Sequence, residues 1–416
     1  MSTAPGPPAS DAAICPVRVD PFTSPYLDDP YTLYPALLSE DGPRYSPDLG
    51  HWLVARHEHV DAVFRDPDTF SAANAQAPLH AVHDDATAIL ADGFRPIRTM
   101  SNLDGPEHTR IRRHNQVGFS ARRLRALEPT IRATTVELIE ALPADGEVDL
   151  VEHLTHPLPA TIIFALLGFP PEDTPMVKSW CGDRLAFSWG RPDRDQQVEI
   201  AEDMVAYYRY CEDHVARQLA DPGDHFTGDL LRIHLDDPAA LSRAEVTHIV
   251  YGLSFAGHET TTNQISNMLR RLLEERHRWE ALVADPAPID DVVAEAIRHD
   301  SSVITWRRVT TRETTIGDAT IPAGAKLLLL LGAANRDPAR FDAPDAFDPG
   351  RANANAALSF GRGKHFCLGA TLAKVEMAVV LSELLIRRPG LRLVEQTLTF
   401  NPNVAFRGPT TLRVTL

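Results

Sequence analysis

The sequence feature that most constrains this chain is the segment ALSFGRGKHFCLGA, which runs from Ala357 to Ala370. Its only cysteine, Cys367, is followed by apolar residues at i, i+3, i+4 spacing, which predict a helix over Leu368 to Leu385. A sulfur at the start of a helix lies among unpaired backbone N–H groups, at the positive end of the helix dipole. This position favours the thiolate, which is the form of cysteine that ligates metals.

Glycines in the same segment suit the close approach of a large flat group. Gly361, Gly363 and Gly369 have no side chain, so the backbone can turn sharply beside a ligand. The run GRGK contains neither of the glycine-rich phosphate-binding patterns. No arginine follows Cys367 before Lys374, as a cysteine phosphatase would require. Two roles remain for Cys367, a buried small hydrophobe or a metal ligand.

The segment also fits a longer pattern, F-x-x-G-x-H-x-C-x-G from Phe360 to Gly369, which resembles the haem-binding loop of cytochromes P450. In that family the cysteine thiolate is the proximal ligand of the haem iron. The resemblance implies that Cys367 binds the iron of haem b, and that Phe360, Gly361 and Gly369 contact the cofactor. It also implies a mainly α fold with small β-sheets, a long central helix and a β-rich subregion.

Length alone would suggest two or three domains, but the composition along the chain favours one. The 416-residue chain is long enough to bury a substantial core, and no linker divides it. Its opening is rich in Ser, Ala and Pro, so we expect residues 1–19 to be a disordered tail and residues 20–416 to form one domain.

Cysteine usage indicates the cellular compartment of the protein, and net charge argues against one class of partner. Four scattered cysteines, no signal peptide and no membrane-length apolar run favour a cytoplasmic protein with no membrane contact. A formal charge of −16 argues against nucleic acid as a partner.

A long helix with an unusual middle is predicted from Ser242 to about Arg276. Ser242 and Glu245 have the spacing of a capping box. Gly257 and the threonines after it weaken the helix where apolar neighbours imply burial. Thr260 can bond back to the carbonyl of the residue four positions earlier, which predicts a local distortion.

This distortion resembles the [AG]-G-x-[DE]-T-[ST] motif of cytochromes P450. The resemblance implies that Ala256 contacts the haem and that Glu259 and Thr260 deliver protons during activation of O2. Without this resemblance, the same residues would be interpreted as a surface glutamate beside capping threonines.

Cationic residues in three segments match the family's haem propionate contacts. His108 and Arg112 lie one turn apart on a predicted helix and can hold an anionic group, although such basic faces are commonly just solvated. The resemblance assigns them to a haem propionate, together with Arg308 of a predicted strand and His365 of the cysteine segment.

An E-x-x-R pattern precedes the cysteine segment by the distance expected in this family. Glu295 and Arg298 are placed to form an ion pair along one helix face. The resemblance adds Arg351 from a following F-x-x-x-R segment and implies that the three residues support the fold rather than the chemistry.

The remaining chain alternates strands, helices and a long irregular stretch. A hairpin is predicted from Arg44 to Ala55, a helix from Glu58 to Phe64, and irregular structure from Ser71 to Pro106. Strands are predicted from Val303 to Leu331, and a hairpin from Leu391 to Leu416 with its turn at 402–403.

By analogy with the family, a substrate pocket is expected from apolar residues of several segments. Its predicted walls include Leu253, Phe255, Val303, Ile304 and Val404. Their character indicates an apolar substrate, including an aromatic one.

Two stretches contain basic residues without acidic ones, residues 108–127 and 351–375. We expect Arg113, Arg122, Arg362 and Lys364 to form a docking surface for an acidic ferredoxin or flavodoxin-like domain. The alternative is that these residues only keep the surface soluble.

The function implied by the resemblance is that of a monomeric haem-thiolate monooxygenase, which inserts one atom of O2 into an apolar substrate. Electrons would come from NAD(P)H through a ferredoxin or flavodoxin and its reductase. Four further segments resemble the haem domains of self-sufficient P450s that carry a fused phthalate-dioxygenase-type reductase, namely residues 45–54, 306–310, 321–327 and 406–409. The sequence ends before such a module, so it is either a standalone relative or an excised haem domain. Two alternatives are oxidative coupling of phenolic or indolic substrates, and a haem-binding sensor or carrier.

Overall fold

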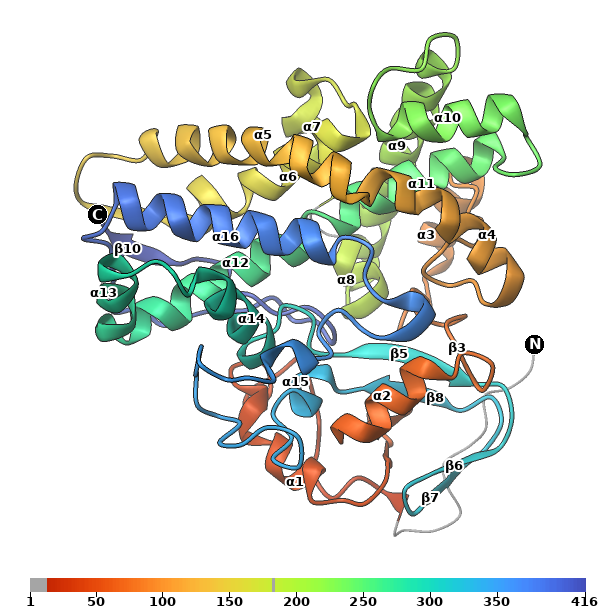
Figure 1. The fold of residues 1–416 in the computed structure, drawn as a ribbon. Coiled ribbons are helices and arrows are strands. Elements are labelled where there is room, and N and C mark those ends of the chain that lie inside the picture. Colours follow the sequence, from red (N-terminus) through yellow and green to blue (C-terminus); the bar gives the residue numbers. More distant parts are fainter. Residues whose placement is uncertain (1–12, 182–183) are drawn as a thin grey trace.

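The computed structural model describes residues 13–181 and 184–416, and these form a mainly helical molecule with small β-sheets (Figure 1). The longer helices are α2 (His57–Arg65), α3 (Asp84–Gly93), α4 (Gly105–Asn115), α5 (Ala121–Glu140), α6 (Pro157–Leu167), α9 (Arg194–Gln218), α10 (Phe226–Asp236), α11 (Arg243–Ala256), α12 (Glu259–Glu274), α13 (Arg276–Ala284), α14 (Ile289–His299) and α16 (Ala370–Arg387). The shorter ones are α1 (Tyr34–Leu38), α7 (Thr174–Ser179), α8 (Arg184–Trp189), α15 (Leu331–Ala334) and the π-helical η4 (Val151–Thr155).

The largest sheet has five strands in the order β1-β2-β8-β5-β3. Its strands are β1 (Arg44–Ser46), β2 (His51–Val54), β3 (Phe70–Ser71), β5 (Trp306–Thr310) and β8 (Lys326–Leu329). The β1–β2 pair is the predicted hairpin, and β2 continues the sheet by pairing in parallel with β8, with Trp52 opposite Leu327. The smaller sheets combine β4 (Glu147–Asp149), β10 (Arg413–Thr415) and β9 (Arg392–Leu393), and β6 (Thr314–Ile316) with β7 (Ala319–Ile321).

A layer of long helices packs beside the sheet and holds most of the core (Figure 1). α16 follows the cysteine segment, packs along α5 and α14, and buries Leu372, Met377, Val380 and Leu384. Each such side chain contributes about 1.5–3 kcal/mol when it leaves water. The apolar repeat after Cys367 therefore forms the predicted helix, displaced by two residues at each end.

The predicted helix from Ser242 to Arg276 is divided in the structure. The Ser242–Glu245 capping box starts α11, but α11 ends at Ala256 and α12 begins at Glu259. Gly257 allows this break to pack closely on α6, because a Cβ atom there would lie 2.7 Å from Cγ1 of Ile163. The expected distortion is therefore a full interruption, and α9 is the longest helix among the described residues.

Three other expectations differ from the structure. The stretch predicted to be irregular from Ser71 to Pro106 contains α3, which packs against α9. Within the predicted disordered tail, residues 1–12 lie outside the described residues, whereas Cys15 bonds to the carbonyl of Tyr45 and Val19 is buried. The C-terminal hairpin has only short paired pieces, at β9–β10 and at a bridge between Phe400 and Pro409.

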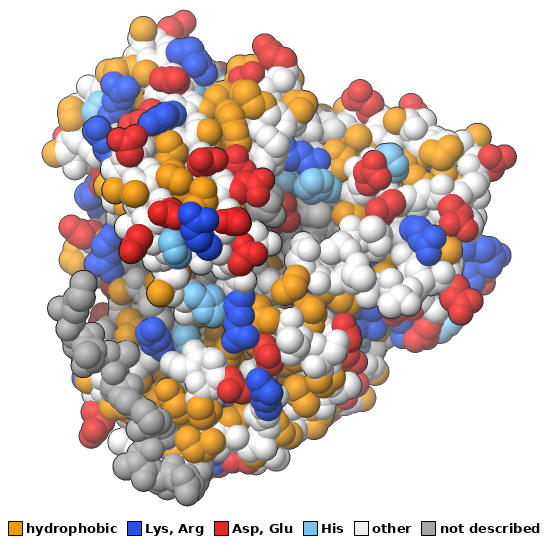
Figure 2. Space-filling model, turned by 180° about the vertical axis from the view of Figure 1, so that it is seen from behind, with side chains coloured by type: hydrophobic (Ala, Val, Ile, Leu, Met, Phe, Trp, Pro, Cys, Tyr) orange, Lys and Arg blue, Asp and Glu red, His pale blue; other side chains and the backbone are white. Residues whose placement is uncertain are grey.

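Charge is distributed without a large single-sign surface on the face shown in Figure 2, where acidic and basic side chains are interspersed. None of the helices in the described part of the chain combines the length and apolar character needed to span a bilayer.

Candidate active site

The segment around Cys367 is a tight turn held by its own backbone. The N–H of Cys367 donates to the carbonyl of Phe360 at 2.8 Å, which closes the loop ahead of α16. Gly363 lies in this loop at φ 66°, and a Cβ atom there would lie only 2.8 Å from the carbonyl oxygen of Phe64. The glycine spacing of the sequence thus reflects both backbone conformation and a close approach to α2.

The protonation of Cys367 depends on opposing influences. The residue surface is exposed, yet the surrounding protein buries its sulfur enough to raise the pKa of the thiol. Backbone N–H groups of Gly369 and Ala370 and the charge of Arg112 act in the opposite direction without overcoming burial. The N–H groups at the helix start therefore favour the thiolate, as expected from the sequence, but burial of the sulfur outweighs them.

The four predicted propionate contacts come together in the structure. The rings of His108 and His365 lie 4.2 Å apart, and Arg112 donates to the carbonyl of Phe366 at 2.6 Å. Arg308 is 1% exposed, and burial lowers its pKa to about 10. Burial, followed by the charge of Arg308, lowers the pKa of His365 to about 4.

These four residues, which we call the cationic cluster for its two arginines, have fewer carboxylates beside them than arginines. The nearby carboxylate is Asp104, with Oδ1 3.4 Å from Nε2 of His365, and Arg308 makes no ion pair within the described residues. The buried Nε2 atom of His108 has no hydrogen-bond partner, and that of His365 has only the long contact with Asp104. Because buried charges and polar atoms are normally paired, the cluster fits an anionic cofactor such as the propionates of haem.

The break between α11 and α12 presents the predicted acid and alcohol. Oγ1 of Thr260 donates to the carbonyl of Ala256 at 2.9 Å, as the sequence predicts. Ala256 is exposed and Thr260 partly so, although both lie between buried stretches of helix. The break therefore opens one side of the helix to accessible space.

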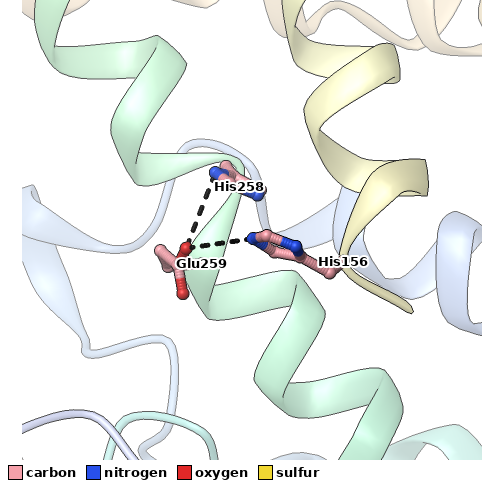
Figure 3. A group of neighbouring side chains, drawn as sticks. All are labelled: His156, His258 and Glu259. Atoms are coloured by element: carbon pink, nitrogen blue, oxygen red, sulfur yellow. Dashed lines mark ion pairs between the residues drawn. The ribbon is translucent and has the colours of Figure 1, made fainter. Parts of the chain in front are cut away.

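Glu259 lies between two histidines that the sequence analysis did not identify (Figure 3). Its Oε1 is 3.8 Å from Nε2 of His156 and 3.7 Å from Nδ1 of His258. Burial acts to raise the pKa of Glu259, but the hydrogen bond from His156 and the charges of both histidines and Lys178 bring it below its ordinary value. No sequence signal marks His156, because it comes from the start of α6, about a hundred residues earlier.

The E-x-x-R pair forms a buried ion pair. Both nitrogens of the Arg298 fork bind the carboxylate of Glu295, at 2.6 and 2.7 Å, and both side chains are fully buried. Arg351 lies 3.4 Å from the same carboxylate. Arg298 also donates to the carbonyls of Asn335, Pro344 and Ala346, so the pair connects α14 to the segment before the cysteine loop.

The predicted pocket residues differ in exposure. The backbone joins the 303–305 and 404–406 segments, since the N–H of Ile304 donates to the carbonyl of Ala405 at 2.8 Å. Ile304 and Val404 are 2% and 1% exposed and belong to the core at this junction. Leu253 and Val303 are partly exposed, and Phe255 is 9% exposed.

The predicted docking residues are mostly exposed. Arg113, Arg122 and Lys364 are exposed, whereas Arg362 is half-buried, 3.7 Å from Asp61. Neighbouring arginines of the same basic stretch are neutralised inside the fold, because Arg110 pairs with Glu245 and Arg123 with Asp229.

Comparisons with known proteins agree with these features. A profile of the cytochrome P450 family matches residues 289–388, which include the buried ion pair and the cysteine segment. The chain is 35% identical over 353 residues to an erythromycin C-12 hydroxylase of Saccharopolyspora erythraea, covering 84% of this chain and 85% of that one.

Solved structures extend the similarity to nearly the whole chain. Cytochrome P450 CREJ, in complex with (4-ethylphenyl) dihydrogen phosphate, has a TM-score of 0.91 and 37% identity, covering 95% of this chain and 98% of that one. An intact type IV self-sufficient cytochrome P450 monooxygenase has a TM-score of 0.94 and 36% identity, covering 99% of this chain but 54% of that larger one. On the strength of these matches, which agree in sequence and in fold, this chain belongs to the cytochrome P450 monooxygenases.

Proposed function

We propose that this P450 inserts one oxygen atom of O2 into an apolar small organic substrate, by hydroxylation or O-dealkylation. The electrons come from NAD(P)H through redox partner proteins. The observation that carries the proposal is the cluster of two arginines and two histidines, His108, Arg112, Arg308 and His365, which has Asp104 as its nearby carboxylate and adjoins the loop of Cys367.

Residues from several segments hold the haem cofactor in this proposal. Cys367 ligates the haem iron, the cationic cluster binds the propionates, and Phe360, Gly361, Gly369 and Ala256 contact the macrocycle. When bound, the haem supplies the redox-active iron at which O2 is reduced.

The chain itself supplies protons at the helix break. Oγ1 of Thr260 already donates to the carbonyl of Ala256, so its lone pairs are available to hold a water molecule in the accessible space beside it. Glu259 lies next to Thr260 in sequence, with its Oε1 3.8 Å from Nε2 of His156, so it can pass a proton from the histidine side to that water.

Substrate character follows from the walls of the site. Leu253, Phe255 and Val303 are apolar, and Trp189 packs against Phe406 at the same junction, with ring centroids 5.0 Å apart. Similarity to a P450 solved with an alkylphenyl phosphate supports an aromatic substrate for this chain as well. Oxidative coupling of phenolic or indolic substrates uses the same site and is separated from hydroxylation by product analysis.

The test is the absorption spectrum of the reduced protein under carbon monoxide. We expect the red-shifted Soret band of a thiolate-ligated haem, and its loss in Cys367→His with haem retained. A wild-type spectrum without that band would reject Cys367 as the ligand. A sensor or carrier would give the band but no turnover with any reductase and substrate.

Electron delivery is proposed to use the basic residues beside the cysteine loop. Charge reversal at Arg113 or Arg122 should lower ferredoxin-driven turnover several-fold and flatten its salt dependence, because rim charges set the association rate. Arg209→Glu on α9 is the matched control, since Arg209 is also exposed. Equal behaviour of all three variants would contradict this docking surface.

A further inference from the structure

Two histidines and one carboxylate converge at the start of α12, outside the cysteine loop and the cationic cluster (Figure 3). One ligand atom of each, from His156, His258 and Glu259, lies within 4.8 Å of the other two. The two imidazole rings are stacked, with centroids 4.9 Å apart, and both nitrogens nearest the carboxylate face the same oxygen, Oε1 of Glu259.

His258 is the unexplained member of this group. Its side chain is 0% exposed, and neither ring nitrogen has a hydrogen-bond partner. Buried polar atoms without partners are rare in proteins and call for a specific explanation, such as an ion that binds them. Nδ1 of His258 is directed at Glu259, so an ion between the two would satisfy it.

A route from solvent reaches the group through His156. The side chain of His156 is 36% exposed and lines a cavity of about 550 Å³. The cavity lies between the start of α6 and α7, and its other walls are Pro157, Thr161, Thr174, Pro175, Lys178 and Ser179.

We propose that His156, His258 and Glu259 bind one divalent transition-metal ion, for which zinc is the best match. Two imidazole nitrogens and one carboxylate oxygen are a three-ligand set that zinc uses in proteins, with water as the fourth ligand. The cavity beside His156 supplies room for that water. Imidazole ligands disfavour magnesium and calcium, which take oxygen ligands.

The positive charge of Lys178 opposes the binding of a metal ion at this group. Its charge acts on both Glu259 and His258, so its removal takes away a cation that competes for the same carboxylate. Lys178→Gln should therefore tighten zinc binding several-fold.

Metal binding also has a consequence for turnover, which rests on the proton-delivery role proposed for Glu259. A carboxylate held by zinc cannot pass protons, so the ion should divert electrons from product to peroxide.

The test is calorimetric titration of zinc chloride into the haem-loaded enzyme. We expect one tight site per chain that His156→Ala weakens more than about tenfold, since losing even an outer-shell partner of a metal costs roughly 10–100-fold. His153→Ala is the matched control, because this exposed histidine lies in η4 just before His156 and should leave binding unchanged. The absence of a tight site, or equal zinc affinity in His156→Ala and wild type, would overturn the proposal.

A parallel measurement of peroxide release separates this inference from the proposed function. Zinc should raise peroxide release in the wild type and not in His156→Ala. Tight zinc binding that depends on His156 but leaves product yield unchanged would keep the metal site and reject proton delivery by Glu259.

Discussion

At the scale of single residues, the fold buries several charged or polar side chains without the ion pairs or hydrogen bonds that such groups usually make. Arg308 is buried without an ion pair among the described residues, His258 has two unpartnered nitrogens, and Glu376 is a carboxyl group 1% exposed. Desolvation of each such group is costly. Under the proposed function, the haem propionates would offset that cost for Arg308, whereas Glu376 lies on α16, where no charge within the described residues compensates its burial.

Thr260→Ala should separate electron flow from product formation. Loss of the hydroxyl removes the group that positions water at the helix break, so we expect product formation to fall by about 10²-fold, the lower range for a positioned proton donor. NADH oxidation should continue and appear as peroxide. Thr260→Ser retains the hydroxyl and should couple normally; an Ala variant that couples as well as the Ser variant would contradict the role of Thr260.

Glu376→Gln should stabilise the protein increasingly as pH rises. Burial raises the pKa of Glu376 to about 8, while an unfolded chain ionises it near 4.5. Between these values the folded state retains a proton that the unfolded state releases, so the wild type loses about 1.4 kcal/mol per pH unit. Urea unfolding of both proteins at pH 5 and pH 7.5 measures this, and a gain that does not depend on pH would refute it.

At the scale of elements, the two buried connections of α14 and α11 position the site. The Glu295–Arg298 pair joins α14 to the segment before the cysteine loop, and the close contact of Gly257 with α6 ends α11 beside Glu259. Both connections are specified by single residues rather than by helical periodicity.

Glu295→Gln should weaken the fold strongly. The change removes the charge that faces the fully buried Arg298, and breaking one side of a buried ion pair costs about 3–5 kcal/mol. Denaturant unfolding of the haem-loaded protein measures the loss. Glu280→Gln is the matched control, since its pair with Arg276 is exposed and its loss should cost less than about 1 kcal/mol; equal losses would be inconsistent with a structural role for Glu295.

Local sequence patterns predicted those elements whose cause is local. The capping box at Ser242, the hairpin of β1 and β2, and the back-bond of Thr260 depend on neighbours in sequence, and the structure contains all three. The full break at Gly257 depends on a contact with Ile163 of another helix. The spacing of apolar residues along the sequence does not predict such a contact.

The candidate site was predictable where a family pattern spans it. His108, Arg112, Arg308 and His365 come from three segments, and only the resemblance united them before the structure placed them together. The sequence analysis did not identify His156, Asp104 or Glu376. No sequence pattern contains these residues, and their surroundings are set by tertiary contacts. The effect of burial on the thiol pKa of Cys367 was not predictable for the same reason, since it comes from segments distant in sequence.

At the scale of the whole molecule, buried neutral histidines make the fold sensitive to acid. Burial lowers the pKa of several of them to about 3 or 4, namely His51, His214, His258, His299 and His365. An unfolded histidine binds a proton near pH 6.5. Between these values the unfolded state holds more protons than the folded state, so stability is present above pH 6.5 and is lost as pH falls toward 4.

Urea unfolding should therefore become easier between pH 7 and pH 5, with protons taken up on unfolding. Each of these histidines contributes up to about 1.4 kcal/mol per pH unit. His214→Gln should reduce the pH dependence, because the ring of His214 lies near the carbonyl of Leu167 in the helical core and not in the active site. A midpoint independent of pH in this range would show that the histidines titrate alike in both states.

The pairing of β2 with β8 has a consequence for how the chain acquires its fold. Residues 52–54 are partnered in parallel by residues 327–329, so the N-terminal hairpin gains its inner neighbour only after most of the polypeptide has been made. Closing such a long loop costs chain entropy before any sheet contact repays it, and parallel pairing across distant segments folds slowly. During synthesis, the edge of β2 that will pair with β8 therefore stays unpaired until residues 327–329 have been made. Unpaired strand edges are prone to associate with other chains.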